Sequence, residues 1–243
     1  MTQAGPRLVV GLGNPGSRYA GNRHNIGFMV LDALAARRGL AFAPLGEVGL
    51  LAVDGDLHLL KPLCYMNLSG EAVVAWSDLT GVPVTGRSVP ATPDAASDSI
   101  SDPISDPMSD PISDPISDPA SDPMSDPTSG LRPLVVCDDL ALPLGSVRLR
   151  ERGSSGGQNG LASVIAHLGG EEFPRLRLGV APLDGPVDPA DWPDYVLADF
   201  APGQAAEVAE LVDHAVAAIE AWLAEGLAVA ISRHNRRIRP PAD

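Results

Sequence analysis

The stretch that decides the fold is residues 8–16, Leu-Val-Val-Gly-Leu-Gly-Asn-Pro-Gly. Its first three residues predict a buried strand, and residues 26–38 have the apolar spacing of a helix. The glycines fit the G-x-G-x-x-G pattern of dinucleotide sites, but such a site requires a helix that opens at the third glycine. Here Pro15 and Gly16 indicate a turn, and polar residues delay the helix to Ile26. The stretch therefore predicts the strand, loop and helix of an α/β protein, without a nicotinamide site.

The remaining pattern alternates strands and helices around these two elements. A hairpin is predicted around Asp54-Gly55, and a long alanine-rich amphipathic helix lies near the end of the chain. The predicted strands are residues 50–53, 57–60, 134–137, 147–150 and 177–180, and the predicted helices are residues 70–79, 160–168 and 202–225. This alternation predicts an α/β fold, in which residues 1–243 form a single domain with a twisted mixed β-sheet flanked by helices on both faces.

Residues 93–130 differ from the rest of the chain in composition. They contain a Ser-Asp-Pro-x repeat, which runs from Ser101 to Thr128. Because proline at every fourth position prevents a helix or a sheet ladder, and because the aspartates repel one another, the segment is predicted to be a disordered insert in the domain. Residues 88–131 hold nine aspartates and no lysine or arginine, so without them the formal net charge of −14 would be −5. The acidic balance therefore does not exclude a polyanionic partner.

The composition predicts a soluble protein of the cytoplasm. Hydrophobic residues make up 44% of the chain. No run approaches the roughly 18 uncharged apolar residues that a membrane-spanning helix requires, and the first residues lack the apolar segment of a signal peptide. Cys64 and Cys137 form neither a close pair nor a metal-ligand cluster. Both are expected to be reduced and buried, and no metal or other cofactor is predicted.

Residues 153–157, Gly-Ser-Ser-Gly-Gly, fit the G-x-S-x-G pattern of a nucleophilic serine. In that hypothesis Ser155 attacks the substrate, and His167 or His214 is the base. The preceding strand carries charged residues at alternate positions, whereas the nucleophile strand of an α/β-hydrolase is buried on both faces. A flat loop whose backbone amides approach a ligand is therefore favoured, and a serine esterase remains an alternative.

A second hypothesis rests on five polar residues. Three of the six asparagines, Asn14, Asn67 and Asn159, lie in loops that follow strand-like segments. His24 precedes the first helix, and Asp138 comes directly after a predicted buried strand. Open α/β sheets bind ligands at strand ends, so a shared polar site is expected there, although surface loops would explain the same residues. Histidine, with an ordinary pKa of about 6.5, takes a proton from water when a carboxylate holds its other nitrogen, and asparagine amides hold water or a carbonyl.

Four runs carry a resemblance to the bacterial peptidyl-tRNA hydrolases. They are residues 9–16 with Tyr19 and residues 23–27, residues 61–62 with residues 65–70, residues 138–140 with residues 142–145, and residues 156–161. The chain resembles this family over nearly its whole length, apart from the insert and the extreme termini. The resemblance implies a monomeric, metal-independent enzyme with a mixed α/β sheet, which hydrolyses the ester between a peptide, or a blocked amino acid, and tRNA.

The same resemblance assigns roles to the polar residues. It implies that His24 is the general base, that Asp138 orients it, and that Asn14 positions the histidine or the substrate beside the scissile ester. An amide grip on the peptide backbone would favour peptidyl or blocked aminoacyl groups over a free aminoacyl group. The implied substrate contacts are Tyr19 and Met66, which line the cleft, and Asn67 and Asn159, which hold the peptide backbone and the reactive water.

Arg148, Arg150 and Arg177 lie where the resemblance implies basic residues that bind tRNA phosphates, a role suited to guanidinium groups. Two positions depart from the family pattern, since Gln158 stands where histidine is common and Ala141 replaces an acidic residue. Neither change removes the predicted base or its partner. The acidic insert is expected to project away from the cleft. A catalytically silent RNA-binding relative is the alternative from another class, and the retained histidine, aspartate and asparagines argue against it.

Overall fold

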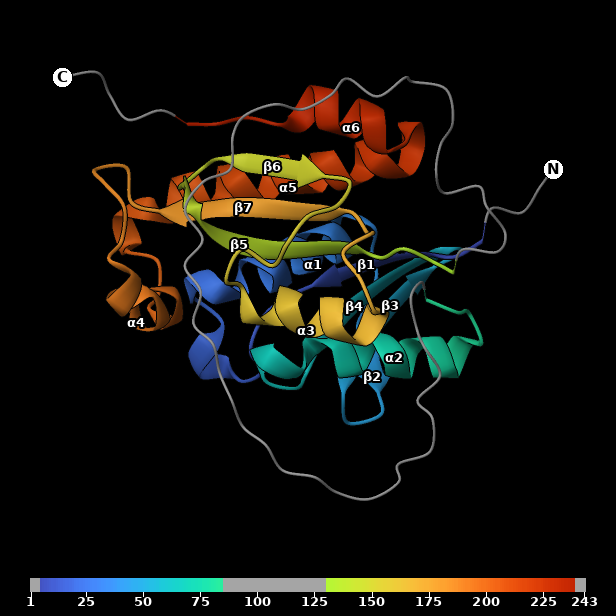
Figure 1. The fold of residues 1–243 in the computed structure, drawn as a ribbon. Coiled ribbons are helices and arrows are strands. Elements are labelled where there is room, and N and C mark those ends of the chain that lie inside the picture. Colours follow the sequence, from blue (N-terminus) through green and yellow to red (C-terminus); the bar gives the residue numbers. More distant parts are fainter. Residues whose placement is uncertain (1–4, 85–129, 239–243) are drawn as a thin grey trace, which may run out of the picture.

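The computed structural model of the protein describes residues 5–84 and 130–238. Its strands form one seven-stranded sheet in the order β2-β3-β4-β1-β5-β7-β6 (Figure 1). The strands are β1 (Arg7–Gly11), β2 (Ala43–Leu45), β3 (Gly49–Asp54), β4 (Leu57–Pro62), β5 (Leu134–Pro143), β6 (Val147–Arg150) and β7 (Arg175–Ala181). The neighbours β4, β1, β5 and β7 run parallel, whereas β2, β3 and β6 are added antiparallel. The predicted mixed sheet is confirmed.

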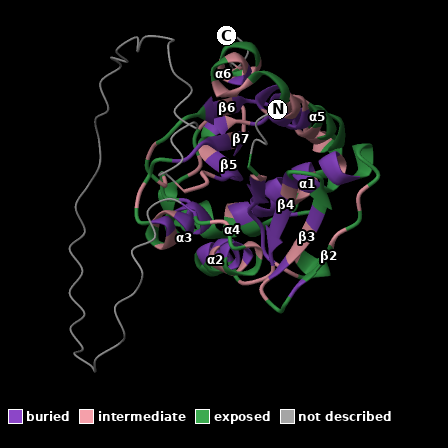
Figure 2. Ribbon diagram, turned by 90° about the vertical axis from the view of Figure 1, so that its right-hand side faces the viewer, coloured by how far each residue is buried: buried purple, intermediate pink, exposed green. Residues whose placement is uncertain are grey.

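Helices cover both faces of this sheet, as predicted (Figure 2). On one face lie α1 (Ile26–Arg37) and α5 (Ala205–Glu225), and on the other lie α2 (Ser69–Thr80) and α3 (Asn159–Leu168). Two short helices, α4 (Trp192–Leu197) and α6 (Leu227–His234), follow β7 and α5. The 3-10 helices are η1 (Ser17–Tyr19), η2 (Arg23–Asn25), η3 (Met66–Leu68), η5 (Pro189–Asp191) and η6 (Pro202–Gln204).

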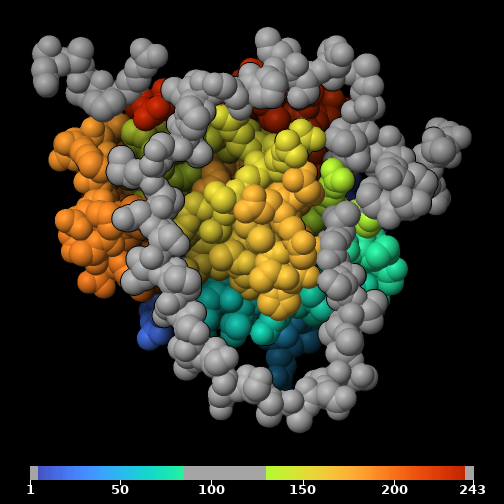
Figure 3. All heavy atoms as spheres, in the orientation of Figure 1, coloured from blue at the N-terminus to red at the C-terminus, as the bar shows by residue number. Residues whose placement is uncertain are grey.

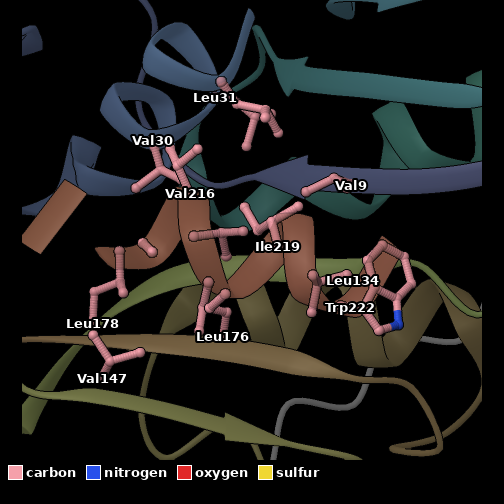
Figure 4. Packing of buried hydrophobic residues seen from close by; sticks show 14 of the residues in the cluster. Val9, Val30, Leu31, Leu134, Val147, Leu176, Leu178, Val216, Ile219 and Trp222 are labelled. Carbon is pink, nitrogen blue, oxygen red and sulfur yellow. The ribbon is translucent and has the colours of Figure 1, made fainter. Parts of the chain in front are cut away.

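The two faces of the sheet make two separate hydrophobic cores. Side chains alternate between the faces along each strand, so Val9 of β1 packs with α1 and α5, whereas Leu8 and Val10 pack with α2 and α3. All three are fully buried, as expected for a central strand covered on both sides. Figure 4 shows the first core, where Ile219 and Trp222 of α5 lie against apolar side chains of the strands.

A glycine contact fixes α1 close to the sheet. A Cβ atom at Gly27 would lie 2.5 Å from the carbonyl oxygen of Leu12 and 2.6 Å from that of Val136, so only glycine fits this position. Gly11 of β1 is required for the same close approach, because a Cβ atom there would lie 2.5 Å from the carbonyl oxygen of Gly27. The close approach brings η2, the turn before α1, next to the carboxyl ends of β1 and β5.

The structure differs from the sequence predictions at several elements. The strand predicted at residues 134–137 continues to Pro143, and the sequence pattern missed β2, α4 and α6. Cys137 is buried as predicted, but the prediction for Cys64 was wrong, since its side chain is only partly buried and its Sγ atom contacts the carbonyl oxygen of Leu68. The apolar pattern predicts burial poorly in the irregular segment that holds Cys64.

The predicted insert, residues 93–130, lies outside the described residues except for Gly130. The residues that flank this part of the chain are close together, because Val84 and Leu131 form a parallel β-bridge. The amide of Leu131 also donates to the carbonyl oxygen of Pro83 over 2.7 Å. In the part of the chain that the structure covers, no helix is long and apolar enough to cross a membrane.

Candidate active site

One cleft collects most of the predicted site residues. It has a volume of about 770 Å³ and lies at the carboxyl ends of β1, β4 and β5, where parallel sheets place their ligands. The predicted residues that line it are Asn14, Tyr19, His24, Met66, Asn67, Asp138, Asn159 and Arg177. Arg148 and Arg150 are not among the lining residues.

His24 and Asp138 meet in this cleft, although 114 residues separate them in the chain. His24 is the middle residue of η2, and Asp138 lies within β5 rather than after it. The Nδ1 atom of His24 is 2.9 Å from each carboxylate oxygen of Asp138, and the side chains are only 11% and 4% exposed. Because a carboxylate accepts a hydrogen bond, Nδ1 carries the proton and the lone pair of Nε2 is left to accept one.

Gln158 completes the surroundings of the carboxylate. It is the N-cap residue of α3, and its Oε1 atom accepts from the amide of Leu161 over 2.6 Å. This contact orients the side chain so that Nε2 donates to Oδ1 of Asp138 over 3.1 Å. The same nitrogen lies 3.4 Å from Sδ of Met66. The sequence identified Gln158 only as a departure from a family pattern, and its contact with Asp138 was not predicted.

Asn14 is held in one orientation by its neighbours. Its backbone amide donates to Oδ1 of Asn25, and its carbonyl oxygen accepts from Nδ2 of Asn25, both over 2.9 Å. Its side-chain Oδ1 accepts from the amide of Met66 over 2.9 Å, so the Nδ2 group is the part left to face the cleft. A buried, oriented N–H donor of this kind can stabilise negative charge on a substrate oxygen. The sequence indicated no role for Asn25, whose side chain makes this placement.

The packing of α2 against α3 positions the other two asparagines. Asn67 lies in η3 directly before α2, and Asn159 is the first residue of α3. The two helices touch where the amide of Gly70 donates to Oγ of Ser163 over 3.0 Å. On the face shown in Figure 3, the gold surface of α3 adjoins the blue-green surface of α2. Both asparagines are exposed and line the cleft, so their amides are open to a ligand.

Another wall of the cleft comes from α4, which the sequence did not predict. Trp192, Val196 and Leu197 of this helix line the cleft. Arg23, the neighbour of His24, fixes the segment, because its guanidinium lies 4.2 Å from the ring centroid of Tyr195 and donates to backbone carbonyl oxygens that follow the helix. Arg23 is buried, so these contacts between Arg23 and the α4 segment lie inside the folded protein. Residues 188–193, Asp-Pro-Ala-Asp-Trp-Pro, hold two prolines and lack the apolar periodicity of a helix, so α4 could not be predicted from them.

The predicted phosphate-binding arginines come from the β6–β7 hairpin. Arg148 is the cross-strand partner of Arg177, and Arg150 that of Arg175. Only Arg177 reaches the cleft, where its guanidinium donates to Oδ2 of Asp139 over 3.3 Å and to the carbonyl oxygen of Ser154 over 2.6 Å.

Burial affects the neighbouring Arg175. It lowers the pKa of Arg175 to about 10, and that residue is only 1% exposed. Arg175 donates to the carbonyl oxygens of Ser154, Glu171 and Phe173. It therefore holds the loop before α3 and is closed to a ligand.

The geometry does not favour the alternative sites. His167 contacts the carbonyl oxygen of Ser163, and His214 contacts that of His234, so neither candidate base pairs with Ser155. The segment after Gly16 forms η1 instead of an α-helix, as the rejection of a dinucleotide site predicted. Within residues 5–84 and 130–238, no group of three or more His, Cys, Asp or Glu side chains is arranged to hold a metal ion.

Comparisons with known proteins identify the family of the chain. The family described as peptidyl-tRNA hydrolase matches residues 8–89 and 128–241. Peptidyl-tRNA hydrolase of Chloroflexus aurantiacus is 39% identical over 233 residues, covering 94% of this chain and 98% of the relative. That of Synechococcus sp. (strain JA-3-3Ab) is 42% identical over 236 residues, covering 94% and 82%. The crystal structure of the Acinetobacter baumannii peptidyl-tRNA hydrolase superposes with a TM-score of 0.69 at 25% identity, covering 97% of this chain and 96% of that one. The chain belongs to the peptidyl-tRNA hydrolase family.

Proposed function

We propose that this chain hydrolyses the ester that joins a peptide to the terminal ribose of tRNA, with a water molecule activated by His24. The observation that carries the proposal is the buried contact between Nδ1 of His24 and Asp138 at the edge of the cleft. It leaves Nε2 as a base, and the family membership supplies the substrate class.

The reaction has two steps. In the first, Nε2 of His24 accepts a proton from water while the water oxygen bonds to the ester carbonyl carbon, and the carbonyl π electrons move to oxygen. In the second, those electrons re-form the carbonyl, the bond to the ribose oxygen breaks, and that oxygen takes the proton from Nε2. Asp138 stabilises the imidazolium between the two steps. The products are a peptide with a free carboxyl group and a tRNA with a free ribose hydroxyl.

The asparagines hold the substrate during these steps. The Nδ2 group of Asn14 donates to the ester oxygen on which negative charge develops, because its Oδ1 atom is engaged by Met66. Asn67 and Asn159 bind the peptide backbone and the water. A free α-ammonium group finds no carboxylate partner in such amides, so a blocked or peptidyl substrate is preferred. Tyr19 packs against the substrate.

The tRNA itself contacts the arginines of the β6–β7 hairpin. Arg177, inside the cleft, and Arg148 and Arg150, beyond it, bind phosphates near the acceptor end. Arg177 keeps one side of its guanidinium on Asp139, so it binds as a positioned donor rather than as a free charge. We propose that the protein acts as a monomer.

The test is release of label from N-acetylated aminoacyl-tRNA and from its unblocked counterpart. The wild-type protein is expected to cleave the blocked substrate selectively, and His24→Ala to lose at least about 100-fold in kcat. His214→Gln is the matched control, because His214 lies on α5 outside the cleft, where its Nε2 atom contacts the carbonyl oxygen of His234 and its ring lies against the ring of His234.

Three results would contradict the proposal. Folded wild-type protein without activity on the blocked substrate would favour a silent RNA-binding relative. Full activity of His24→Ala would exclude that residue as the base. Loss of activity in Ser155→Ala, with labelling of the wild type by a fluorophosphonate, would restore the serine hypothesis.

A further inference from the structure

The segment after α6 extends the sheet beyond β6. Arg236 and Val147 form an antiparallel bridge, with reciprocal backbone hydrogen bonds of 2.8 and 2.9 Å. Asn235 donates to the carbonyl oxygen of Leu149 and accepts from its amide, and the amide of Ile238 donates to Oγ of Ser146 over 3.0 Å. In Figure 1 this red segment runs along β6. The last described residues are therefore hydrogen-bonded along the edge of the sheet.

The alternation of side chains places Arg237 on the arginine face of this edge. Val147 packs into the core with α5, and its bridge partner Arg236 points to the same side, where it pairs with Glu210 of α5. The next residue, Arg237, therefore points to the opposite side of the sheet. Arg148 and its cross-strand partner Arg177 project from that opposite side. β7, β6 and the segment after α6 thus contribute one guanidinium each to a common surface.

The electrostatics agree with this arrangement. Burial lowers the pKa of Arg148, and the repulsion of nearby guanidinium groups, including that of Arg237, lowers it further, while Asp139 opposes the shift. Within the described residues, neither Arg148 nor Arg237 forms an ion pair, whereas Arg233 pairs with Glu225. A partly buried guanidinium that is repelled by neighbouring guanidinium groups, as Arg148 is, favours an anionic ligand.

A second groove joins this surface to the active site. It has a volume of about 610 Å³, and Arg237 lines it together with residues at the ends of β5 and β7. Leu140 and Ala141 line both this groove and the catalytic cleft, so the two cavities are adjacent. A polymeric ligand whose end lies beside His24 can therefore continue past Arg177 towards Arg237.

We propose that Arg237, which lines the second groove, and Arg148, on the neighbouring strand β6, bind the phosphodiester backbone of the tRNA substrate beyond its terminal nucleotides. The inference rests on the proposed function and adds a binding site that is built by the end of the chain. A guanidinium fork binds phosphate oxygens in a bidentate manner, which suits a repeated phosphate ligand better than an isolated carboxylate. The continuity with the cleft favours RNA over another polyanion.

The test compares two substrates that differ only in the tRNA body. Cleavage of N-acetylaminoacyl-tRNA and of the N-acetylaminoacyl ester of the trinucleotide CCA is measured for the full chain, Arg237→Gln and Arg233→Gln. Arg233→Gln is the matched control, because it removes the same charge from an exposed residue of α6. Arg237→Gln is expected to lower kcat/KM for the tRNA substrate about fivefold at 0.15 M salt, the effect of one lost phosphate contact, and to leave the trinucleotide ester unchanged.

Binding of uncharged tRNA gives a second measurement. The slope of log Kd against log salt concentration is expected to decrease by about 1 in Arg237→Gln and to stay constant in Arg233→Gln. An unchanged tRNA affinity and rate in Arg237→Gln would overturn the proposal, and so would an equal loss on both substrates or an equal loss in the control. A wild-type protein that cleaves neither substrate would instead refute the proposed function, which separates the two failures.

Discussion

Asp138 determines which nitrogen of His24 acts as the base. Replacing it by asparagine keeps the shape, but an amide that donates to Nδ1 would move the imidazole proton to Nε2, where it blocks proton abstraction. We therefore expect Asp138→Asn to lower kcat on blocked aminoacyl-tRNA by about 10²- to 10⁴-fold, with little change in thermal unfolding. A variant that kept more than roughly a tenth of the wild-type rate would mean that the carboxylate is dispensable.

Gln158 is a positioning residue, because it acts on the substrate only through Asp138. Gln158→Ala removes both the donor to the carboxylate and the cap of α3, so we expect about tenfold lower kcat and a loss of about 1 kcal/mol in the free energy of unfolding.

Gln158→Glu separates the two effects. It keeps the cap acceptor but adds a second carboxylate beside Asp138, which favours the imidazolium form of His24. The acidic limb of the pH profile of kcat should therefore move to higher pH. Identical pH profiles for Gln158→Glu and the wild type would show that Gln158 has only a structural role.

His58 gives the protein a sensitivity to acid. Burial lowers the pKa of His58, Asp56 opposes the shift, and the neutral Nδ1 atom accepts from Nε1 of the fully buried Trp76 over 2.9 Å. Because the unfolded chain has an ordinary histidine pKa of about 6.5, it binds more protons than the folded chain below that pH, and stability should fall there as the pH decreases. His58→Gln retains an acceptor without titrating. Urea unfolding at pH 7.5 and pH 5.5 should show a smaller difference in this variant, and an equal difference would exclude His58 as the source.

At the scale of elements, the site depends on how closely neighbouring helices and strands approach. The glycine contact of α1 with β1 and β5 brings His24 to Asp138. The contact of α2 with α3 brings Asn67 and Asn159 to one cleft. Each approach is set by a residue without a side chain, so a single methyl group should disturb it.

Gly70 provides the test of this dependence. A Cβ atom there would lie 2.4 Å from Nδ1 of His167 and 2.6 Å from the carbonyl oxygen of Ser163, so alanine must push α2 away from α3. We expect Gly70→Ala to cost about 1–3 kcal/mol of unfolding free energy and to raise KM for the blocked substrate. Gly203→Ala is the control, since a Cβ atom at Gly203 would have no neighbour within 4 Å. Equal stability of the two variants would mean that the helices adjust without cost.

At the scale of the whole molecule, the acidic insert is separable from the family fold. The family match leaves out residues 90–127, and Val84 and Leu131, on either side, are already bridged. Deleting residues 90–127 and joining the ends by a short linker should change the free energy of unfolding by less than about 1 kcal/mol, because the entropy of closing a connection depends only weakly on its length.

The same deletion removes nine aspartates, so association with tRNA should become faster at low salt and change little at physiological salt. Unfolding followed by circular dichroism measures the change in stability, and stopped-flow binding at two salt concentrations measures the change in the rate of association with tRNA. Failure of the shortened chain to fold would show that the insert contributes to the structure. The predicted disorder of residues 93–130 and their direction away from the cleft remain predictions.

The sequence by itself determined the fold class, the family and the residue types of the site. Apolar runs such as residues 8–10 and the helical spacing of residues 26–38 are local patterns, and a local pattern specifies whether a segment is buried and with which periodicity. The four family runs added the polar residues in their order. Short or irregular elements such as β2 and α4 lack enough periods to be predicted, which is why the cleft wall that α4 provides was missed.

Only the tertiary structure decided which of these residues touch. It brought His24 to Asp138 across 114 residues, gave Gln158 its contact with the carboxylate, and turned Arg177 towards Asp139. It also placed the two candidate bases of the serine alternative, His167 and His214, in contact with backbone carbonyl oxygens. The physical reason is that burial follows from hydrophobic spacing along the chain, whereas a contact between distant polar groups follows from sheet register and from helix packing within a few tenths of an ångström, which no local pattern contains.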